Sequence, residues 1–193
     1  MMAFGVNLNL ITGQSGCARR TGRTRPAVRS ELSVDPAEEK QVHRARLSSW
    51  HRHDAVVQPG DTDYSGYMWH GNYLRLLEAA RVELMLACGL NYGTLVSEYG
   101  METPVVDMKL RYRRPAKLRD SVCVLSKGER KGIRLCIKGQ ILRAGDMELL
   151  LESEATLVFV NMNTGLPVRR IPPEIEEACR RFANFGEESL NEE

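Results

Sequence analysis

A single long segment with helical spacing, residues 71–88, stands among segments whose residues alternate like those of β-strands. Its apolar residues recur three and four positions apart, which places them on one stripe of a helix. Gly89 follows at once, and glycine is common where a helix ends. A chain with one long amphipathic helix is expected to bury that stripe against a sheet. The predicted stripe consists of Tyr73, Leu76, Leu77, Ala80, Leu84 and Cys88.

Strand-like segments lie on both sides of this helix. Residues 53–60 form a short run that ends at Pro59-Gly60. Residues 103–115 alternate apolar with charged side chains, which is the pattern of a half-buried strand. Its apolar face would hold Val106, Met108, Leu110 and Tyr112. Further strands are predicted at 120–130, 132–145 and 147–165, and a short helix at 172–182. The order predicts an α+β fold with strand, long helix, four antiparallel strands and short helix.

One helix on one antiparallel sheet leaves a sheet face or an edge strand without cover. A second copy of the same chain is the simplest partner that could cover this face or edge. The sequence has no internal repeat that could do so within one chain. We therefore expect a homodimer or homotetramer.

The first thirty residues differ in composition from the rest of the chain. They contain five arginines, no lysine and no acidic residue, together with serine, threonine and small residues. This composition is typical of an organelle transit peptide, and we expect a plastid as its destination, with a mitochondrion second. The alternative is an N-terminus without a targeting role. No apolar run approaches the roughly 18 residues that span a bilayer. The expected organisation is a transit peptide at 1–30, a disordered linker at 31–50, one folded domain at 51–183 and an acidic tail at 184–193.

The five cysteines show neither a CxxC pair nor a zinc-ligand spacing with histidine. Cys88, Cys123 and Cys136 lie among apolar residues. We interpret them as small core residues of a protein in a reducing compartment, and we expect no metal site.

The segment GDTDYSGYMWHGNY, residues 60–73, combines two aspartates, three glycines and a histidine just before the helix. Asp61, Asp63 and Ser65 have the spacing of the first ligands of a calcium-binding EF-hand loop. Such a loop needs a glutamate at its twelfth position, where this chain has Asn72, and it follows a helix rather than a strand. The segment is therefore not predicted to bind calcium.

A helix start offers a different chemistry. The first backbone N–H groups of a helix have no partner inside it and carry partial positive charge. Groups near His70 and Gly71 could polarise a carbonyl and stabilise an oxyanion, and Gly66 and Gly71 allow the backbone to turn closely. Asp63, a few residues upstream, could activate water or attack the same carbonyl carbon. Asp61 is interpreted as a residue that only caps the turn.

The stretch DTDYSGYMWHGNYLRLLEAARVELM resembles the signature of hotdog-fold thioesterases of the 4-hydroxybenzoyl-CoA thioesterase class. RYRRPAKLRDSV resembles a strand and turn of that family, and NMNTGLPVRRIP its last-strand turn. The resemblance covers roughly residues 52–182. It implies a hotdog fold, in which a five-stranded antiparallel sheet wraps around a long helix, and the hydrolysis of an acyl thioester.

The resemblance also implies roles for single residues. Asp63 would be the nucleophile or the general base, and the two stay open. His70 would give its backbone N–H to the thioester oxygen, with assistance from its side chain, while Gly66 and Gly71 shape the site. Glu78 fits a structural helix role better than that of a second carboxylate. No metal or redox cofactor is implied, and the family works as dimers or tetramers.

The carrier of the acyl group is the remaining question. Residues 109–143 hold twelve lysines and arginines against two acids. Such a block could attract the phosphates of coenzyme A (CoA) or the acidic acyl carrier protein (ACP), with Arg113, Arg114 and Lys117 as the expected contacts. The alternative is a solvated strand face. Few aromatic residues interleave with the basic ones, so nucleic acid is not an expected partner.

The expected function is hydrolysis of fatty acyl-ACP in a plastid. One alternative is a 1,4-dihydroxy-2-naphthoyl-CoA thioesterase of quinone biosynthesis. A non-catalytic protein that binds acyl thioesters on the same fold is the other.

Overall fold

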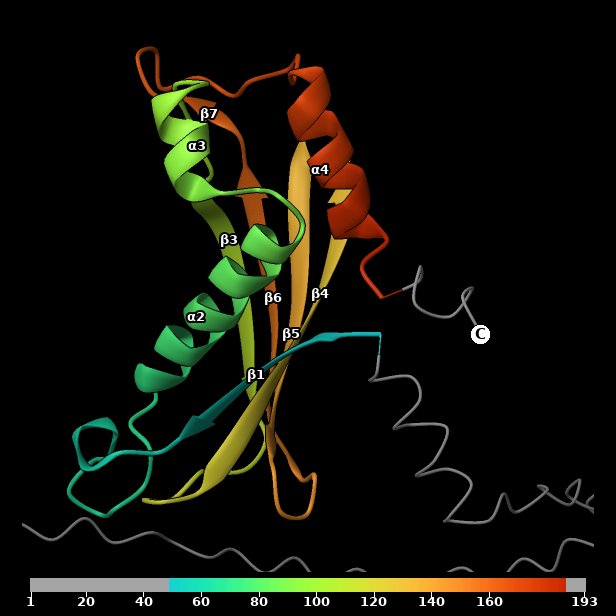
Figure 1. The fold of residues 1–193 in the computed structure, drawn as a ribbon. Coiled ribbons are helices and arrows are strands. Elements are labelled where there is room, and N and C mark those ends of the chain that lie inside the picture. The colour runs from blue at the N-terminus through green and yellow to red at the C-terminus, as the bar shows by residue number, and fades with distance from the viewer. Residues whose placement is uncertain (1–48, 187–193) are drawn as a thin grey trace, which may run out of the picture. The chain divides into compact units, whose positions relative to one another are not determined.

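The computed structural model describes residues 49–186, which form a curved antiparallel sheet with a long helix lying across one of its faces (Figure 1). The strand order is β1-β4-β5-β6-β3, and every neighbouring pair is antiparallel. This arrangement confirms the predicted α+β fold of one long helix on a five-stranded sheet. The strands are β1 (His51–Val56), β3 (Val105–Tyr112), β4 (Ser121–Lys131), β5 (Arg134–Arg143) and β6 (Leu149–Val158).

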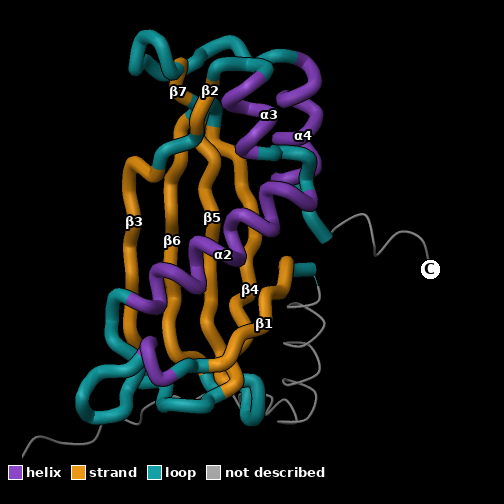
Figure 2. The backbone as a smooth tube through the Cα atoms, turned by 60° about the vertical axis from the view of Figure 1, so that its left-hand side comes forward, coloured by secondary structure: helices purple, strands orange, loops and turns teal. Residues whose placement is uncertain are grey.

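Helix α2 (Asn72–Ala87) runs diagonally across the sheet (Figure 2). All six residues of the predicted apolar stripe are buried, and Met85 joins them. Gly89 has a φ of +86°, so it ends the helix in the left-handed conformation that favours glycine. The stripe packs on apolar side chains of the inner sheet face, and each fully buried leucine or valine contributes about 1.5–3 kcal/mol. Those sheet residues include Val122, Val124, Ile141, Leu150 and Leu151.

The short C-terminal helix α4 (Pro173–Ala183) closes the far end of the core with Ile175, Ala178, Cys179 and Phe182. It contacts β4, where a Cβ added at Gly128 would lie 2.5 Å from the carbonyl oxygen of Phe182. Arg130 of β4 donates to Glu176 of α4, with 2.9 Å between Nη2 and Oε2. The helix predicted at 172–182 is therefore confirmed, and a glycine on β4 makes room for it.

The strand predicted at 53–60 ends earlier, at Val56, and the unpredicted 3₁₀-helix η1 (Pro59–Asp61) follows it. Three further elements were not predicted. Helix α3 (Tyr92–Ser97) has only six residues, too few to show a period, and it is started by Asn91, whose side chain accepts from two backbone N–H groups. The strand predicted at 147–165 is wrong in its length, because it ends at Val158 and a separate β7 (Val160–Asn161) pairs with β2 (Met101–Glu102). Helix α3 and strands β2 and β7 lie beyond the end of α2 (Figure 2).

The strand predicted at 103–115 is shorter than expected and less buried. Val106 and Tyr112 are about half exposed, at 56% and 47%, whereas Met108 and Leu110 are partly buried. A register shift between Val105 and Asp107 turns the start of β3 out of the alternation. Within residues 49–186, β3 is also an edge strand, paired with β6 on one side only.

The predicted cysteine roles agree with the structure where it describes them. Cys88, Cys123 and Cys179 are buried, and Cys136 is partly buried; none of these four is in a disulfide. Burial raises the pKa of Cys88 and Cys179 to about 11, so both thiols stay protonated at neutral pH.

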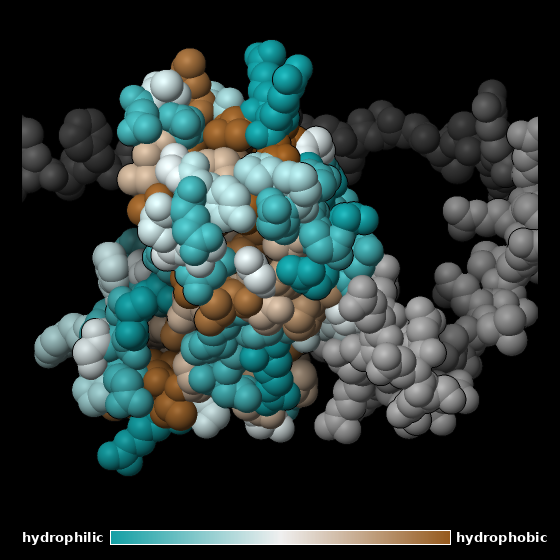
Figure 3. Space-filling view, turned by 45° about the horizontal axis from the view of Figure 1, so that its top comes forward, coloured by the Kyte–Doolittle hydropathy of each residue, from teal (hydrophilic) through white to brown (hydrophobic). Residues whose placement is uncertain are grey.

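The predicted transit peptide, nearly all of the linker and most of the acidic tail lie outside the described residues. No helix within residues 49–186 is long and apolar enough to cross a membrane. The face drawn in Figure 3 shows apolar residues in separate patches among hydrophilic ones.

Candidate active site

The segment between β1 and α2 forms a short hairpin. The backbone N–H of Asp63 donates to the carbonyl of Tyr67 at 2.8 Å, and the N–H of Trp69 donates to the carbonyl of Asp61 at 2.8 Å. Gly66 has a φ of +78° at the turn, which a side chain would strain. The predicted role of Gly66 in shaping the loop therefore has a backbone cause.

Asp61 holds this hairpin to the rest of the protein. Asp61 is only 5% exposed. Its Oδ2 accepts a hydrogen bond from the N–H of Gln58 at 2.9 Å, and its Oδ1 forms an ion pair with Arg75 of α2. Its backbone carbonyl accepts from the side-chain amide of Asn72 at 2.9 Å. Asp61 is therefore structural, in agreement with the predicted capping role.

Asp63 is placed differently from Asp61. It is exposed, and its Oδ1 accepts from the N–H of Ser65 at 2.8 Å and of Tyr67 at 3.2 Å. Its Oδ2 makes no hydrogen bond with any of residues 49–186. Two backbone amides thus orient the carboxylate while its second oxygen stays available for water or a substrate, which is the arrangement required of a general base or nucleophile.

The start of α2 supplies backbone donors. Gly71 is the N-cap and makes no side-chain capping bond. Within the part of the chain that the structure describes, the N–H groups of His70 and Gly71 donate to no hydrogen bond. A Cβ added at Gly71 would lie 1.9 Å from the ring of Trp69, so no other residue fits without movement. The exposed ring of His70 lies tilted against Trp69, with 4.6 Å between centroids.

A residue that the sequence analysis did not single out holds this helix start to the sheet. The hydroxyl of Tyr112 on β3 donates to the carbonyl of His70 at 2.9 Å. The Tyr112 ring also packs edge-on against Tyr73, with 5.5 Å between centroids. The sequence analysis placed Tyr112 on the apolar face of the strand predicted at 103–115; its position in RYRRPAKLRDSV, the stretch that resembles a strand and turn of the thioesterase family, is the signal that could have pointed to a further role.

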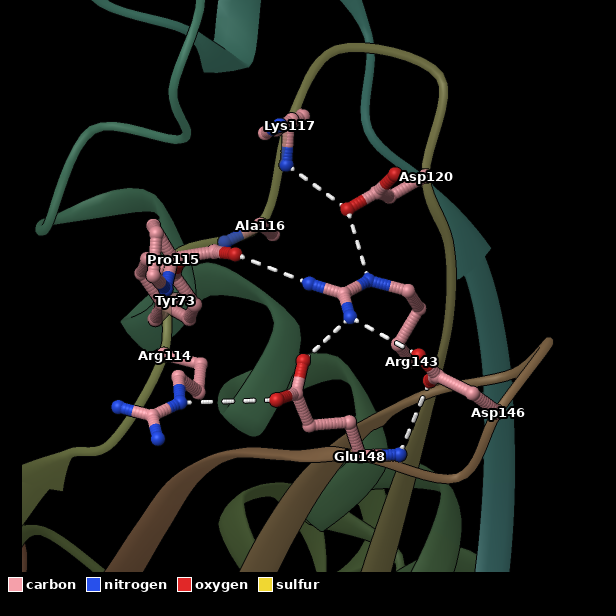
Figure 4. Close-up of polar contacts among 9 residues, drawn as sticks. All are labelled: Tyr73, Arg114, Pro115, Ala116, Lys117, Asp120, Arg143, Asp146 and Glu148. Carbon is pink, nitrogen blue, oxygen red and sulfur yellow. Dashed lines mark hydrogen bonds and ion pairs between the residues drawn. The ribbon is translucent and has the colours of Figure 1, made fainter.

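The turn after β3 is fixed by a second group of contacts (Figure 4). Arg143 of β5 donates to Asp120 at 3.2 Å, to the carbonyl of Pro115 at 3.3 Å, and to Glu148. The hydrogen bond to Glu148 is the main cause that raises the pKa of Arg143 above the ordinary value of an arginine. The N–H of Ala116 donates to the hydroxyl of Tyr73 at 2.9 Å, which ties this turn to α2.

The three predicted carrier contacts are not equivalent. Arg113 pairs with Glu152 at 2.6 Å, and Arg114 pairs with Glu148 at 3.5 Å. The ammonium nitrogen of Lys117 instead lies 5.9 Å from the centroid of the Tyr67 ring, beside the Asp63 hairpin. Of the three, only Lys117 has no ion pair with a described residue, whereas a glutamate already offsets the charge of each arginine.

Below α2 lies a cavity of about 290 Å³, between the helix and the inner face of the sheet. Glu78 lines it, and its side chain is 66% exposed and pairs with Arg81 at 3.0 Å. Among the described residues, no group of three histidine, cysteine, aspartate or glutamate residues is placed to hold a metal.

Comparison with protein families decides the class of this protein. The model of the Thioesterase-like superfamily matches residues 57–179, which is more than half of the chain. The chain belongs to this superfamily. The matched region contains the Asp63 hairpin, α2 and all strands of the sheet except β1. The class of the protein is therefore that of a thioester hydrolase, as predicted.

Relatives of this thioesterase agree with the match. It is 36% identical over 141 residues to sll0410 of Synechocystis, which has a provisional name as an esterase; the alignment covers 70% of this chain and 84% of that protein. It is 28% identical over 140 residues to the 4-hydroxybenzoyl-CoA thioesterase of Pseudomonas, covering 64% and 92% of the two chains.

A solved structure shows the same fold. The 1,4-dihydroxy-2-naphthoyl-CoA thioesterase Slr0204 of Synechocystis superposes with a TM-score of 0.62 at 18% identity. The superposition covers 68% of this chain and 96% of that one. This likeness confirms the predicted hotdog fold. The roles of Asp63, His70, Gly66 and Gly71, and the carrier contacts, stay predictions.

Proposed function

We propose that this protein hydrolyses acyl thioesters and that Asp63 acts on the thioester carbonyl. The observation that carries the proposal is the asymmetry of the Asp63 carboxylate. Its Oδ1 is held by two backbone N–H groups, whereas its Oδ2 has no partner among residues 49–186. A carboxylate that is oriented in this way needs little reorganisation to reach the transition state.

The reaction can follow either of two balanced courses. As a general base, Asp63 removes a proton from water while the water oxygen bonds to the acyl carbon; the C–S bond then breaks, and the thiolate leaves and takes up the proton. As a nucleophile, Asp63 bonds to the acyl carbon and displaces the thiolate, and water then hydrolyses the mixed anhydride. Both courses yield a carboxylic acid and a thiol.

Both courses develop negative charge on the carbonyl oxygen. The N–H groups of His70 and Gly71, which donate to no described residue, lie at the positive end of the α2 dipole. There they can donate hydrogen bonds to that oxygen. Removing one such donor typically lowers kcat by about 10²–10³-fold.

For the finer substrate we propose fatty acyl-ACP in a plastid. The support is the arginine-rich, acid-free composition of residues 1–30 and the exposed cation of Lys117 beside the Asp63 hairpin. A CoA thioester is the second candidate, including an aromatic one such as 1,4-dihydroxy-2-naphthoyl-CoA, because the same cation can contact a CoA phosphate. The names of the relatives favour CoA thioesters.

We also propose that the active unit is a homo-oligomer. β3 is an edge strand whose second side pairs with no strand among the described residues. Large apolar side chains are exposed on β3, and Leu74 of α2 is exposed beside them, since it lines the same cavity as Val105. The exposed residues of β3 are Val105, Val106 and Tyr112. A second copy that pairs along β3 would cover both the edge and these side chains.

The proposal is tested with the full chain and a panel of thioesters. The panel contains acyl-ACPs of several lengths, the matching acyl-CoAs and an aromatic acyl-CoA, and thiol release is measured. Asp63→Asn should lower kcat by about 10²–10⁴-fold while thermal unfolding and acyl-CoA binding stay as in the wild type. Asp54→Asn is the matched control, because Asp54 is an exposed aspartate on β1 that pairs only with Arg52 among the described residues.

Each outcome has a definite meaning. Turnover that survives Asp63→Asn would overturn the role of Asp63. Turnover of acyl-ACP with little of acyl-CoA would support the plastid proposal, and the reverse order would replace it with a CoA thioesterase. A folded protein that binds acyl thioesters but hydrolyses none of the panel would support the alternative of a non-catalytic protein that binds acyl thioesters.

A further inference from the structure

The cavity below α2 has an unusual floor. Ser126 on β4, Gly139 on β5 and Ser153 on β6 lie side by side in register on the inner face of the sheet. The adjacent row, two residues along each strand, contains the buried apolar residues Val124, Ile141 and Leu151. The cavity therefore exists because three neighbouring strands have small residues at the same level.

The glycine of this floor is required by its neighbours. A Cβ added at Gly139 would lie 2.4 Å from the hydroxyl oxygen of Ser153 and 3.0 Å from Leu77 of α2. Ser126 is only 1% exposed and Ser153 is partly buried, both line the cavity, and neither hydroxyl forms a side-chain hydrogen bond within residues 49–186. The cavity between α2 and the sheet thus has two hydroxyl groups at its floor.

Arg81 of α2 places a cation against this cavity. Its side chain is only 13% exposed, and its single hydrogen bond within residues 49–186 goes from Nη2 to Glu78 at 3.0 Å. Its Nε is buried and has no partner in the described chain. A guanidinium has five N–H donors, and enclosing it with one of them used is unfavourable unless a further acceptor arrives.

We propose that Arg81, together with the hydroxyls of Ser126 and Ser153, forms a subsite that binds an oxygen atom near the far end of the acyl group. This subsite rests on the proposed function, because it takes the cavity to hold the acyl group during hydrolysis. The expected ligand is a neutral oxygen such as a hydroxyl or a keto group, since Glu78 already offsets the charge of Arg81. Arg81 is then a residue that determines specificity, and it takes no part in the chemical step.

The position of Arg81 sets the length of the acyl group. Leu74, in the first turn of α2, lines the same cavity, so the cavity begins close to Gly71. A helix rises 1.5 Å per residue and side chains lean back by about one turn, which places the Arg81 guanidinium roughly 10 Å beyond Gly71. The hydrogen bond from Arg81 back to Glu78 agrees with this direction. The volume of about 290 Å³ suits the acyl group alone.

The test compares two substrates that differ in one atom, octanoyl-CoA and 8-hydroxyoctanoyl-CoA. The wild-type enzyme should prefer the hydroxylated chain in kcat/KM by about tenfold, the effect of one hydrogen bond to a charged group. Arg81→Met should lower this ratio about tenfold, and Ser153→Ala should lower it by a smaller factor. Arg180→Met is the matched control, because Arg180 also pairs with a glutamate three positions earlier on a helix but is exposed on α4.

A second measurement separates this subsite from the proposed function. Binding of both CoA thioesters to the Asp63→Asn variant is measured by calorimetry, with and without Arg81→Met. A preference for the hydroxylated chain that Arg81→Met abolishes would support the subsite even if the wild type hydrolysed neither thioester. Equal kcat/KM and equal affinity for the two chains, or a preference that Arg81→Met and Ser153→Ala leave in place, would overturn the subsite even if hydrolysis is fast.

Discussion

The hydroxyl of Tyr112 donates to the carbonyl of His70 at 2.9 Å and so joins the edge strand of the sheet to the start of α2. The His70 carbonyl belongs to the same peptide plane as the N–H of Gly71, and in a trans peptide the two point in opposite directions. Tyr112 therefore fixes the direction of a donor without contacting the substrate. A hydrogen bond accepted by the carbonyl also strengthens the N–H of that peptide as a donor.

Replacing Tyr112 by Phe should reduce catalysis rather than binding. The loss of one hydrogen bond, worth about 1 kcal/mol, should lower kcat by about five- to tenfold while KM stays within about twofold. The edge-on packing against Tyr73 is retained in this variant, so its melting temperature should fall by only a few degrees. Steady-state kinetics and thermal unfolding check both expectations.

The control for this prediction is Tyr99→Phe, which removes the hydroxyl of a partly buried tyrosine that packs against the core near α3. It should leave kcat as it is. An unchanged kcat in Tyr112→Phe, or a rise in KM alone, would show that Tyr112 does not position the helix start.

The two aspartates of the hairpin should separate stability from activity. Asp61→Asn removes the charge that pairs with Arg75, at a residue that is 5% exposed, and should lower the free energy of unfolding by about 1–3 kcal/mol. Asp63→Asn keeps an oxygen that can accept from Ser65 and Tyr67, so its stability should change by less than about 0.5 kcal/mol. Denaturant unfolding of both variants measures the difference, and equal losses would contradict it.

The sequence was sufficient to predict the elements whose apolar residues recur at a regular spacing. The stripe of α2 and the alternation on the strands predicted the helix and the sheet, because burial imposes those periods. It also predicted a structural role for Asp61, although only the structure shows that Arg75 and Gln58 are its partners; the catalytic role of Asp63 stays a prediction. The six-residue α3 left no period to detect, since its start depends on a single side chain, that of Asn91.

Contacts between distant positions were out of reach from one sequence. Tyr112 and His70 are 42 residues apart, and Arg143 meets Pro115 from 28 residues away. No local pattern encodes either pair, because both depend on how β3 and β5 are placed in the sheet. The same holds for the cavity floor, where Ser126, Gly139 and Ser153 become neighbours only through strand register.

Gly71 should tolerate a side chain only if Trp69 is removed. The ring of Trp69 occupies the space into which a Cβ would point, so Gly71→Ala must displace the ring or the helix start. We expect a loss of about 1–3 kcal/mol in the free energy of unfolding and a lower kcat. In the Trp69→Ala background the same substitution should cost at least about 0.5 kcal/mol less, as measured by a double-mutant cycle. Gly60→Ala is the control, because nothing lies within 4 Å of its added Cβ.

The last prediction concerns pH and His51 on β1. Burial lowers the pKa of His51 below its ordinary value of 6.5; nearby Glu83 opposes this effect and His53 adds to it. The ring packs edge-on against Phe185 at 5.7 Å, and its Nδ1 is buried with no partner among the described residues. The folded protein therefore favours the neutral imidazole.

The sign of the pH effect follows from this lowered pKa. Below a pH of about 6.5 the unfolded chain binds a proton at His51 before the folded protein does, so stability falls as the pH falls towards the folded pKa. Above about 6.5 both states are neutral at this position and the contribution is constant. The free energy of unfolding, measured in denaturant from about pH 8 to about pH 5, should fall less steeply in His51→Phe than in the wild type. An equal slope in His51→Phe and the wild type would contradict the prediction.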